Sequence, residues 1–100
     1  MALQDVQAEH QRISILIALK DSADYGANTS MLADVLKRYA LGCSRDQLKT
    51  LLSWLEQNGY VVLEKLSENT WIARITATGI DVAEGSITAP GIKRPAPRSY

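Results

Sequence analysis

Residues 41–59, LGCSRDQLKTLLSWLEQNG, decide the fold because they contain a whole helix together with its start and stop signals. Ser44 is followed three residues later by Gln47, which is the pattern of a capping box. Asn58 and Gly59 form a strong C-terminal signal. Four leucines with the i, i+3, i+4, i+7 spacing of one helix face lie between these signals: Leu48, Leu51, Leu52 and Leu55. The stretch predicts a helix that starts after Ser44, ends at Asn58 and buries its leucines.

A second helix is predicted just before this stretch. Residues 28–30 offer three good N-cap side chains, and the helix is expected to stop near Ala40. Its apolar positions again have helical spacing and are Leu32, Val35, Leu36 and Tyr39. Only residues 41–43 join the two helices, and Gly42 is expected to take the left-handed conformation that is usual just past a helix end. Such a short link predicts a helix-turn-helix corner.

The N-terminal segment predicts another helix, over residues 3–20. One apolar stripe with a 3-4-3-4 spacing consists of Leu3, Val6, His10, Ile13 and Ile17. Ile15 and Leu19 fall off this stripe, so the second half of the helix is apolar on more than one side. We expect it to be buried between two layers or against a second subunit. The predicted homodimer interface consists of Ile13, Ile15, Leu16 and Leu19.

After Gly59 the pattern changes from helical to strand-like. Residues 60–63 and 71–76 are rich in β-branched and aromatic side chains, with the polar residues 67–69 between them, which predicts a β-hairpin. Thr76 is a good cap for a short last helix that ends at the next glycine signal, Gly85. Residues 21–27, by contrast, are polar and contain a glycine, and they predict a break in regular structure.

The predicted fold is therefore α+β and mostly helical: a winged helix-turn-helix domain over residues 1–85, with a three-helix bundle, a β-hairpin wing and a short C-terminal helix. Residues 86–100 predict a flexible, extended tail, because Pro90, Pro95 and Pro97 exclude helix and strand. The chain has 11 basic and 11 acidic residues. Three basic and no acidic residues lie in the tail, so eight basic and eleven acidic residues remain before it. An acidic body of net −3 carries a basic tail of net +3.

Four stretches carry a resemblance to a known family: residues 44–47 (SRDQ), 54–61 (WLEQNGYV), 75–85 (ITATGIDVAEG) and 90–95 (PGIKRP). They are similar to the small winged helix-turn-helix proteins of Mu-like phages and prophages, which are often labelled ArsR-like regulators. The resemblance spans nearly the whole chain. It implies a phage protein in the cytoplasm of a bacterial host, and it implies this context more firmly than a mechanism.

The helix after Ser44 is the predicted recognition helix, because the DNA major groove admits one helix whose N-terminal half faces base edges. The predicted DNA contacts on this helix are Ser44, Arg45, Lys49, Thr50 and Ser53. The predicted contacts in the hairpin are Lys65 and Asn69, and those in the tail are Lys93, Arg94 and Arg98. An acidic body binds polyanions poorly, so this hypothesis requires Arg45, Lys49, Lys65 and the tail to lie on one side.

Each of these features also has an interpretation without DNA binding. Asp46 and Glu56 dilute the charge of the predicted recognition helix, which would then be an ordinary solvated face. The hairpin could simply close the core, and the tail could simply improve solubility. The alternative function is a protein–protein adaptor on the same scaffold, in which the near-neutral helix and the flank at Trp54 meet a phage or host protein.

Several function classes are excluded on composition. A lone Cys43 cannot form an internal disulfide, and with a single His10 it cannot complete a tetrahedral metal site. The sequence has no Ser-His-Asp, paired-carboxylate or phosphate-loop pattern. No apolar run approaches the length of about 20 residues that a membrane helix needs. We therefore expect no enzyme, no cofactor, no metal and no membrane partner.

Overall fold

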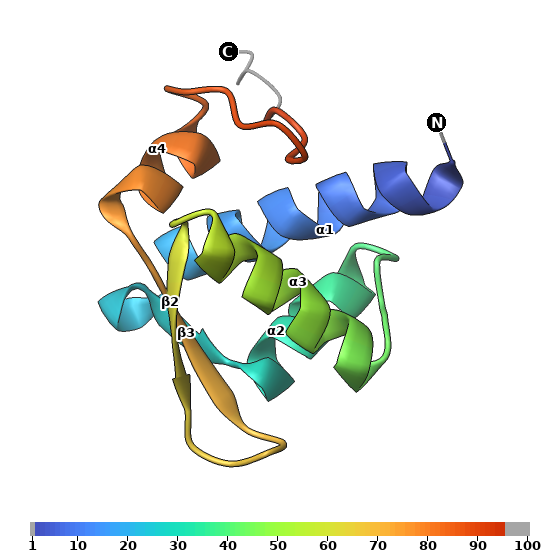
Figure 1. Ribbon diagram of the computed structural model, residues 1–100, viewed down its shortest axis with the longest axis vertical. Coiled ribbons are helices and arrows are strands. Elements are labelled where there is room, and N and C mark those ends of the chain that lie inside the picture. Colours follow the sequence, from blue (N-terminus) through green and yellow to red (C-terminus); the bar gives the residue numbers. More distant parts are fainter. Residues whose placement is uncertain (1, 96–100) are drawn as a thin grey trace.

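The computed structural model describes residues 2–95 and has an α+β architecture that is mostly helical (Figure 1). Over these residues it contains four α-helices, one short 3-10 helix and one three-stranded antiparallel sheet. The elements follow in the order α1 (Leu3–Lys20), η1 (Ala23–Tyr25), β1 (Gly26–Asn28), α2 (Thr29–Arg38), α3 (Arg45–Gln57), β2 (Val61–Lys65), β3 (Trp71–Ile75) and α4 (Ala77–Glu84). The predicted helices and the predicted hairpin are confirmed. No helix in the described part is both long and apolar enough to span a bilayer.

Three helices start at the side-chain caps that the sequence predicts. At α2, Asn28 Oδ1 accepts a hydrogen bond of 2.8 Å from a backbone amide in the first turn. At α3, Ser44 Oγ accepts from the Gln47 amide at 3.1 Å, while the Ser44 amide donates to Gln47 Oε1 at 2.9 Å. At α4, Thr76 Oγ1 accepts from the Gly79 amide at 3.0 Å. Each cap satisfies a backbone donor that the first turn of a helix leaves unpaired.

The link between α2 and α3 differs from the prediction in one residue. The left-handed conformation is taken by Ala40, with φ 58°, and not by Gly42. The Leu41 amide donates to the Leu36 carbonyl at 2.8 Å, and the Ala40 amide donates to the Lys37 carbonyl at 3.1 Å. These two bonds form a Schellman motif, which satisfies the last carbonyls of α2. Gly42 instead permits a close approach, because a Cβ there would lie 3.3 Å from Lys37 Cγ.

Strand β1 lies within the segment for which the sequence predicts a break. It pairs antiparallel with β3, with Ala27 opposite Ala73, and β2 pairs with the other side of β3, with Leu63 opposite Ala73. The strand order is β1-β3-β2. The three residues of β1 are Gly26, Ala27 and Asn28. None of them has a β-branched side chain, so the sequence of this segment does not indicate a strand. Only the pairing with a strand more than forty residues later makes this segment a strand.

Helix α1 is buried through a different face from the predicted stripe. Leu3, Val6 and Ile17 are 79%, 37% and 36% exposed. The N-terminal end of α1 lies at the edge of the molecule (Figure 1), and residues 2–7 are exposed. The helix packs against α2, α3, α4 and the sheet. Its buried residues are therefore Gln11, Ile13, Ile15, Leu16 and Leu19.

The side chains predicted to form a dimer interface lie inside the single chain. Ile13 is 6% exposed within the single chain, and Ile15, Leu16 and Leu19 are 0% exposed. Their excess of apolar surface is covered by the chain's own helices and sheet, so these side chains form the centre of the core. A second subunit could reach them only if this core opened.

Residues 86–95 pack on the body instead of forming an extended, mobile tail. Ala89 and Ile92 are 6% and 7% exposed. A turn at residues 90–91 places Gly91 at φ 84°, and Arg12 Nη1 donates to the Gly91 carbonyl at 2.8 Å. The folded unit therefore extends past the boundary that the sequence predicts at residue 85. The prolines do exclude helix and strand from residues 86–95, but the side chains between them still find partners.

Candidate nucleic-acid interface

Helix α3 turns the side opposite its leucines toward solvent, as predicted. Leu48, Leu51, Leu52 and Leu55 are at most 6% exposed, and this burial fixes the rotation of the helix. The side chains predicted to contact DNA lie outside this leucine face. Those of Ser44, Arg45 and Thr50 are exposed, and those of Lys49 and Ser53 are half-buried.

Two hydroxyl groups on this side already have a partner. Ser44 Oγ accepts the capping bond from Gln47, and Thr50 Oγ1 donates to the Asp46 carbonyl at 3.0 Å. A hydroxyl has one donor and two acceptor sites. Ser44 can therefore still donate, and Thr50 can still accept, a hydrogen bond from a ligand.

A cluster of Lys49, Lys65 and Trp71 joins α3 to the hairpin. Lys49 Nζ lies 5.5 Å from the centroid of the Trp71 ring, and Lys65 Nζ lies 4.5 Å from the same centroid. Lys65 on β2 is directly opposite Trp71 on β3 in the strand register. Sequence reasoning did not connect these three residues. A hairpin centred on residue 68 already implies the pairing of 65 with 71, but only the packing of α3 on β2 brings in Lys49.

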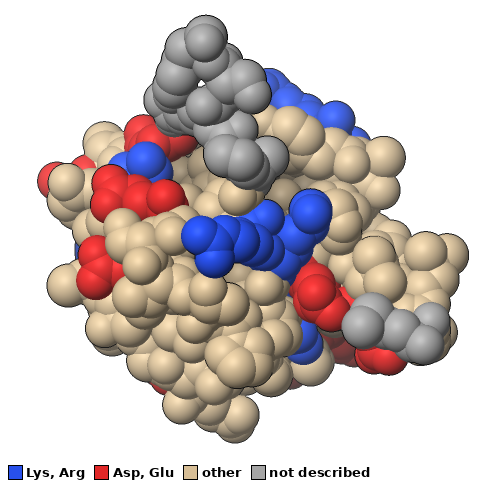
Figure 2. Space-filling view, turned by 90° about the horizontal axis from the view of Figure 1, so that it is seen from above, with Lys and Arg blue, Asp and Glu red and all other residues tan. Residues whose placement is uncertain are grey.

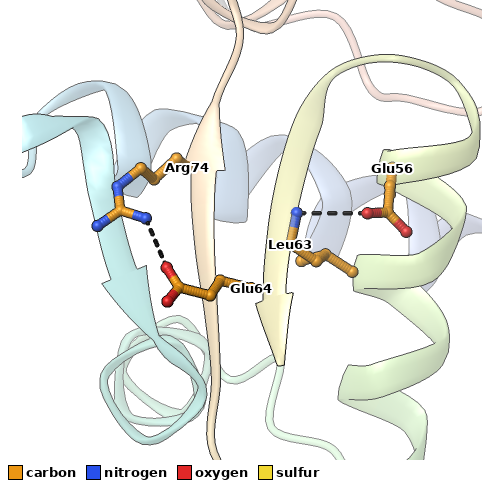
Figure 3. Close-up of polar contacts among 4 residues, drawn as sticks. All are labelled: Glu56, Leu63, Glu64 and Arg74. Atoms are coloured by element: carbon orange, nitrogen blue, oxygen red, sulfur yellow. Dashed lines mark hydrogen bonds and ion pairs between the residues drawn. The ribbon is translucent and has the colours of Figure 1, made fainter. Parts of the chain in front are cut away.

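The position of β2 against α3 is held by a hydrogen bond from the Leu63 amide to the Glu56 carboxylate, with a distance of 3.3 Å (Figure 3). This amide is on the free edge of β2, where no further strand can accept from it. Glu56 therefore satisfies an edge donor and fixes the hairpin to the helix. On the other side of β2, Glu64 Oε1 pairs with Arg74 Nη1 at 3.2 Å (Figure 3).

Arg45 and Asn69 border one groove between the start of α2, the start of α3 and the hairpin turn. The groove has a volume of about 340 Å³, and its lining also contains Asp34 and Lys37. Thr29 Oγ1 donates to the Asn69 carbonyl at 3.2 Å, which ties the hairpin turn to the start of α2. The structure thus brings Arg45 and Asn69 together, with one further base and one acid beside them.

Lys93 and Arg94 lie on a different surface. Their segment, red in Figure 1, is at the end of the molecule opposite the hairpin turn. There they line a groove of about 740 Å³ with residues of α1 and α4, among them Lys20 and Glu84. Seen from this end, acidic and basic side chains are interspersed (Figure 2). The tail cations are therefore not gathered with those of α3 and the hairpin, and Arg98 lies outside the described residues.

The Trp54 ring is covered by its own chain. Arg12 Cζ lies 4.0 Å from the ring centroid, and a Cβ on Gly91 would lie 2.8 Å from Trp54 Cζ2. Burial is the main influence on the pKa of Arg12 and lowers it, while the charges of Glu9 and Asp5 raise it. A guanidinium nevertheless stays charged at physiological pH. The sequence contains no signal for this contact, because residues 12, 54 and 91 are far apart in the chain.

Cys43 is half-buried just before the first turn of α3, and burial raises the pKa of its thiol. A raised pKa keeps a thiol protonated and slow to react at neutral pH. Among residues 2–95, no three His, Cys, Asp or Glu side chains come together in a group that could hold a metal ion.

Two known proteins are similar to this chain over nearly its whole length. Uncharacterized protein gp26 of Escherichia phage Mu is 36% identical over 97 residues, which are 97% of this chain and 99% of that protein. An uncharacterized protein of Haemophilus influenzae is 32% identical over 99 residues, which are 99% of this chain and 96% of that protein. No family model and no solved structure matches the chain.

Proposed function

Since the chain belongs to the family of gp26 of Escherichia phage Mu, we propose that it binds double-stranded DNA through a winged helix-turn-helix domain, as a regulatory or accessory protein of a phage or prophage. The order of the elements supports this fold. A helix and a short strand precede the pair α2 and α3, a hairpin follows, and the early strand joins the edge of the hairpin in the order β1-β3-β2. The link of α2 to α3 is as short as a helix-turn-helix corner requires.

The observation that carries the proposal is the shared location of cations from α3 and the hairpin. Lys49 and Lys65 meet at the Trp71 ring, and Arg45 borders the groove that ends at Asn69. The exposed side of α3 starts at a capped N-terminus. In helix-turn-helix proteins, the N-terminal residues of the second helix contact base edges. The cations of α3 and the hairpin thus meet one part of the charge distribution that the DNA hypothesis needs, whereas the tail cations, at the other end of the molecule, do not add to it.

Each side chain then has a defined role in the proposal. Arg45, in the first turn of α3, reads a guanine with its two-pronged guanidinium, and the hydroxyls of Thr50 and Ser53 contact base edges or phosphates beside it. Lys49 and Lys65 bind the phosphate backbone. Lys93 and Arg94 contribute only a weak attraction that does not depend on DNA sequence, because they lie at the other end of the molecule. No catalytic step is part of the proposal.

A protein–protein adaptor is the second candidate, and one feature of the sheet favours it. Val62, on the face of the sheet that points away from α3, is 59% exposed, and Leu66 just after β2 is 57% exposed. Exposed apolar side chains of this size are common at protein interfaces. The flank at Trp54, in contrast, is occupied by Arg12 and Gly91 and offers little surface to a partner.

Fluorescence anisotropy with labelled duplexes tests the DNA hypothesis. At about 50 mM salt, where phosphate contacts are strongest, we expect the chain to bind duplex fragments of phage Mu DNA and, more weakly, a random duplex. Arg45→Ala should remove the preference between them, which a bidentate contact sets at about 1–3 kcal/mol. The matched control Lys93→Ala/Arg94→Ala should keep it. If the wild-type chain binds no duplex at this salt concentration, the adaptor becomes the better hypothesis.

A further inference from the structure

We propose that Lys49 and Lys65 bind one and the same phosphate of the DNA backbone, with Trp71 as the platform that holds both ammonium groups beside it. The inference rests on the proposed DNA binding and goes further, because it assigns the helix and the hairpin to a shared contact. A phosphate that both elements bind fixes the position of the helix–hairpin junction on the DNA backbone.

The distances to Trp71 place the two cations within reach of one anion. Their nitrogens lie 5.5 Å and 4.5 Å from the same ring centroid, so they are no more than 10 Å apart. Lysine stems are flexible, and each ammonium group needs to come to about 2.7–2.9 Å from a phosphate oxygen. Both ammonium groups lie near the same ring, so an anion beside this ring is close to both of them.

The cluster has no internal counter-charge. The ion pairs within residues 2–95 are Lys20 with Asp21 and Arg74 with Glu64, so neither Lys49 nor Lys65 has a carboxylate within 4.0 Å. Two like charges held at one ring repel each other, and an anion between them would remove this repulsion. The arrangement therefore favours an anionic ligand over an empty site.

Four carboxylates lie nearest to the two lysines along the chain: Asp46, Glu56, Glu64 and Glu68. Asp46 and Glu68 form no ion pair with either lysine, and the other two are directed elsewhere. Glu64 precedes Lys65 and lies on the opposite face of the sheet, because successive strand residues alternate, and there it pairs with Arg74 (Figure 3). Glu56 is two helical turns after Lys49 on the same face of α3, and its carboxylate accepts from the Leu63 amide (Figure 3).

The same packing explains why the lysines meet. Leu63 and Lys65 are two residues apart and so share one face of β2, while Glu56 and Lys49 share one face of α3. The contact of Glu56 with Leu63 aligns these two faces. Lys49 and Lys65 then lie further along the same contact, toward the hairpin turn. The site is thus set by the backbone of two elements and not by chance orientation of surface side chains.

The salt dependence of DNA affinity distinguishes one shared phosphate from two separate ones. For duplex DNA, the slope of log affinity against log salt changes by about 0.9 for each phosphate that is neutralised. We expect the double variant Lys49→Gln/Lys65→Gln to lower the slope by about 0.9. Two separate phosphates would give a change of about 1.8. Glutamine removes the charge and keeps part of the side chain. The control Lys20→Gln, at the end of the molecule opposite the hairpin turn, should leave the slope nearly unchanged.

A scan with methylphosphonate, a neutral replacement for single backbone phosphates, gives a second reading on the bound duplex. When the shared phosphate is the one replaced, neither Lys49→Gln nor Lys65→Gln should lower the DNA affinity further, because both lysines have already lost their anionic partner. This should happen at one and the same position for both variants. A slope change near 1.8, no slope change, or a different such position for each lysine overturns the shared site while DNA binding stands. Absence of duplex binding by the wild-type chain overturns the proposed function and this inference together. Melting curves of all variants establish that they are folded.

Discussion

The guanidinium carbon of Arg12 lies 4.0 Å from the ring centroid of Trp54, and Nη1 of the same group donates to the Gly91 carbonyl at 2.8 Å. One side chain of α1 therefore holds both α3 and the segment 86–95. The Lys93 amide adds a backbone bond of 3.3 Å to the Glu9 carbonyl one turn earlier on α1. Residues 86–95 are part of the domain because α1 carries these contacts.

Substitution of Arg12 tests this contact. Arg12→Ala should lower the free energy of unfolding by about 1–3 kcal/mol, because it removes a cation–π contact and a charged hydrogen bond. Arg12→Lys should recover only part of this loss, since an ammonium group cannot lie flat on the ring and donate in its plane as a guanidinium does. Urea unfolding curves measure both values. Equal stability of the lysine variant and the wild type would show that the planar group is irrelevant.

Gly91 should tolerate no side chain, for two separable reasons. Its φ of 84° strains any other residue by about 1–2 kcal/mol, and an alanine Cβ would lie 2.8 Å from Trp54 Cζ2. Gly59 is a matched control, because its φ is 81° but nothing lies within 4 Å of its Cβ position. We expect Gly91→Ala to lower the melting temperature more than Gly59→Ala. Equal losses would mean that the steric contact with Trp54 has no effect.

Ala40 occupies a position that suits glycine. At φ 58°, in the Schellman motif after α2, it carries a strain that glycine would not have. Ala40→Gly removes this strain, but glycine also makes the unfolded chain more flexible, which offsets part of the gain. The net effect should be an increase in the free energy of unfolding of up to about 1 kcal/mol. The same exchange inside α2, Ala33→Gly, should lower it by about 1 kcal/mol or more. A loss of stability in the Ala40 variant would contradict this account of the turn.

The rotation of α3 is checked by three substitutions. Leu52 is 0% exposed, and Leu52→Ala should cost about 2–5 kcal/mol. Ser44→Ala should lower the free energy of unfolding by about 1 kcal/mol, because it removes the hydroxyl that accepts the capping bond from the Gln47 amide. Ser53→Ala should be nearly neutral. Thermal and urea unfolding report all three, and a severe effect of Ser53→Ala with a mild effect of Leu52→Ala would contradict the observed rotation.

Cys43 should make the protein less stable at alkaline pH. Burial raises the pKa of its thiol in the folded state above the unfolded value of about 8.5. The contribution of the protonated Cys43 thiol to the free energy of unfolding is therefore complete below about pH 8.5, and it is lost as the pH rises through the folded pKa. Melting temperatures of the wild type and Cys43→Ala should converge, or change order, between pH 7 and about 10. Parallel curves would contradict a raised pKa, as would rapid reaction of the wild-type thiol with a disulfide reagent at neutral pH.

Sequence patterns alone predicted the helices, the side-chain N-caps of α2, α3 and α4, and the buried face of α3. Each of these features depends on residues within a few positions of one another, such as Ser44 with Gln47 or Leu48 with Leu52. Hydrogen bonds and apolar contacts at that separation form wherever the chain turns as a helix, so the pattern is sufficient. The hairpin is local in the same sense, and its register pairs Lys65 with Trp71.

Only the tertiary structure decided what covers each surface. Ile15 and Leu19 look like surplus apolar area in the sequence, but both are buried within the single chain. Strand β1, the cover over Trp54 and the meeting of Lys49 with Lys65 likewise join residues distant in sequence. Which distant partner an apolar or charged side chain meets depends on how whole elements pack against one another, and a pattern of period two or 3.6 describes only one element at a time.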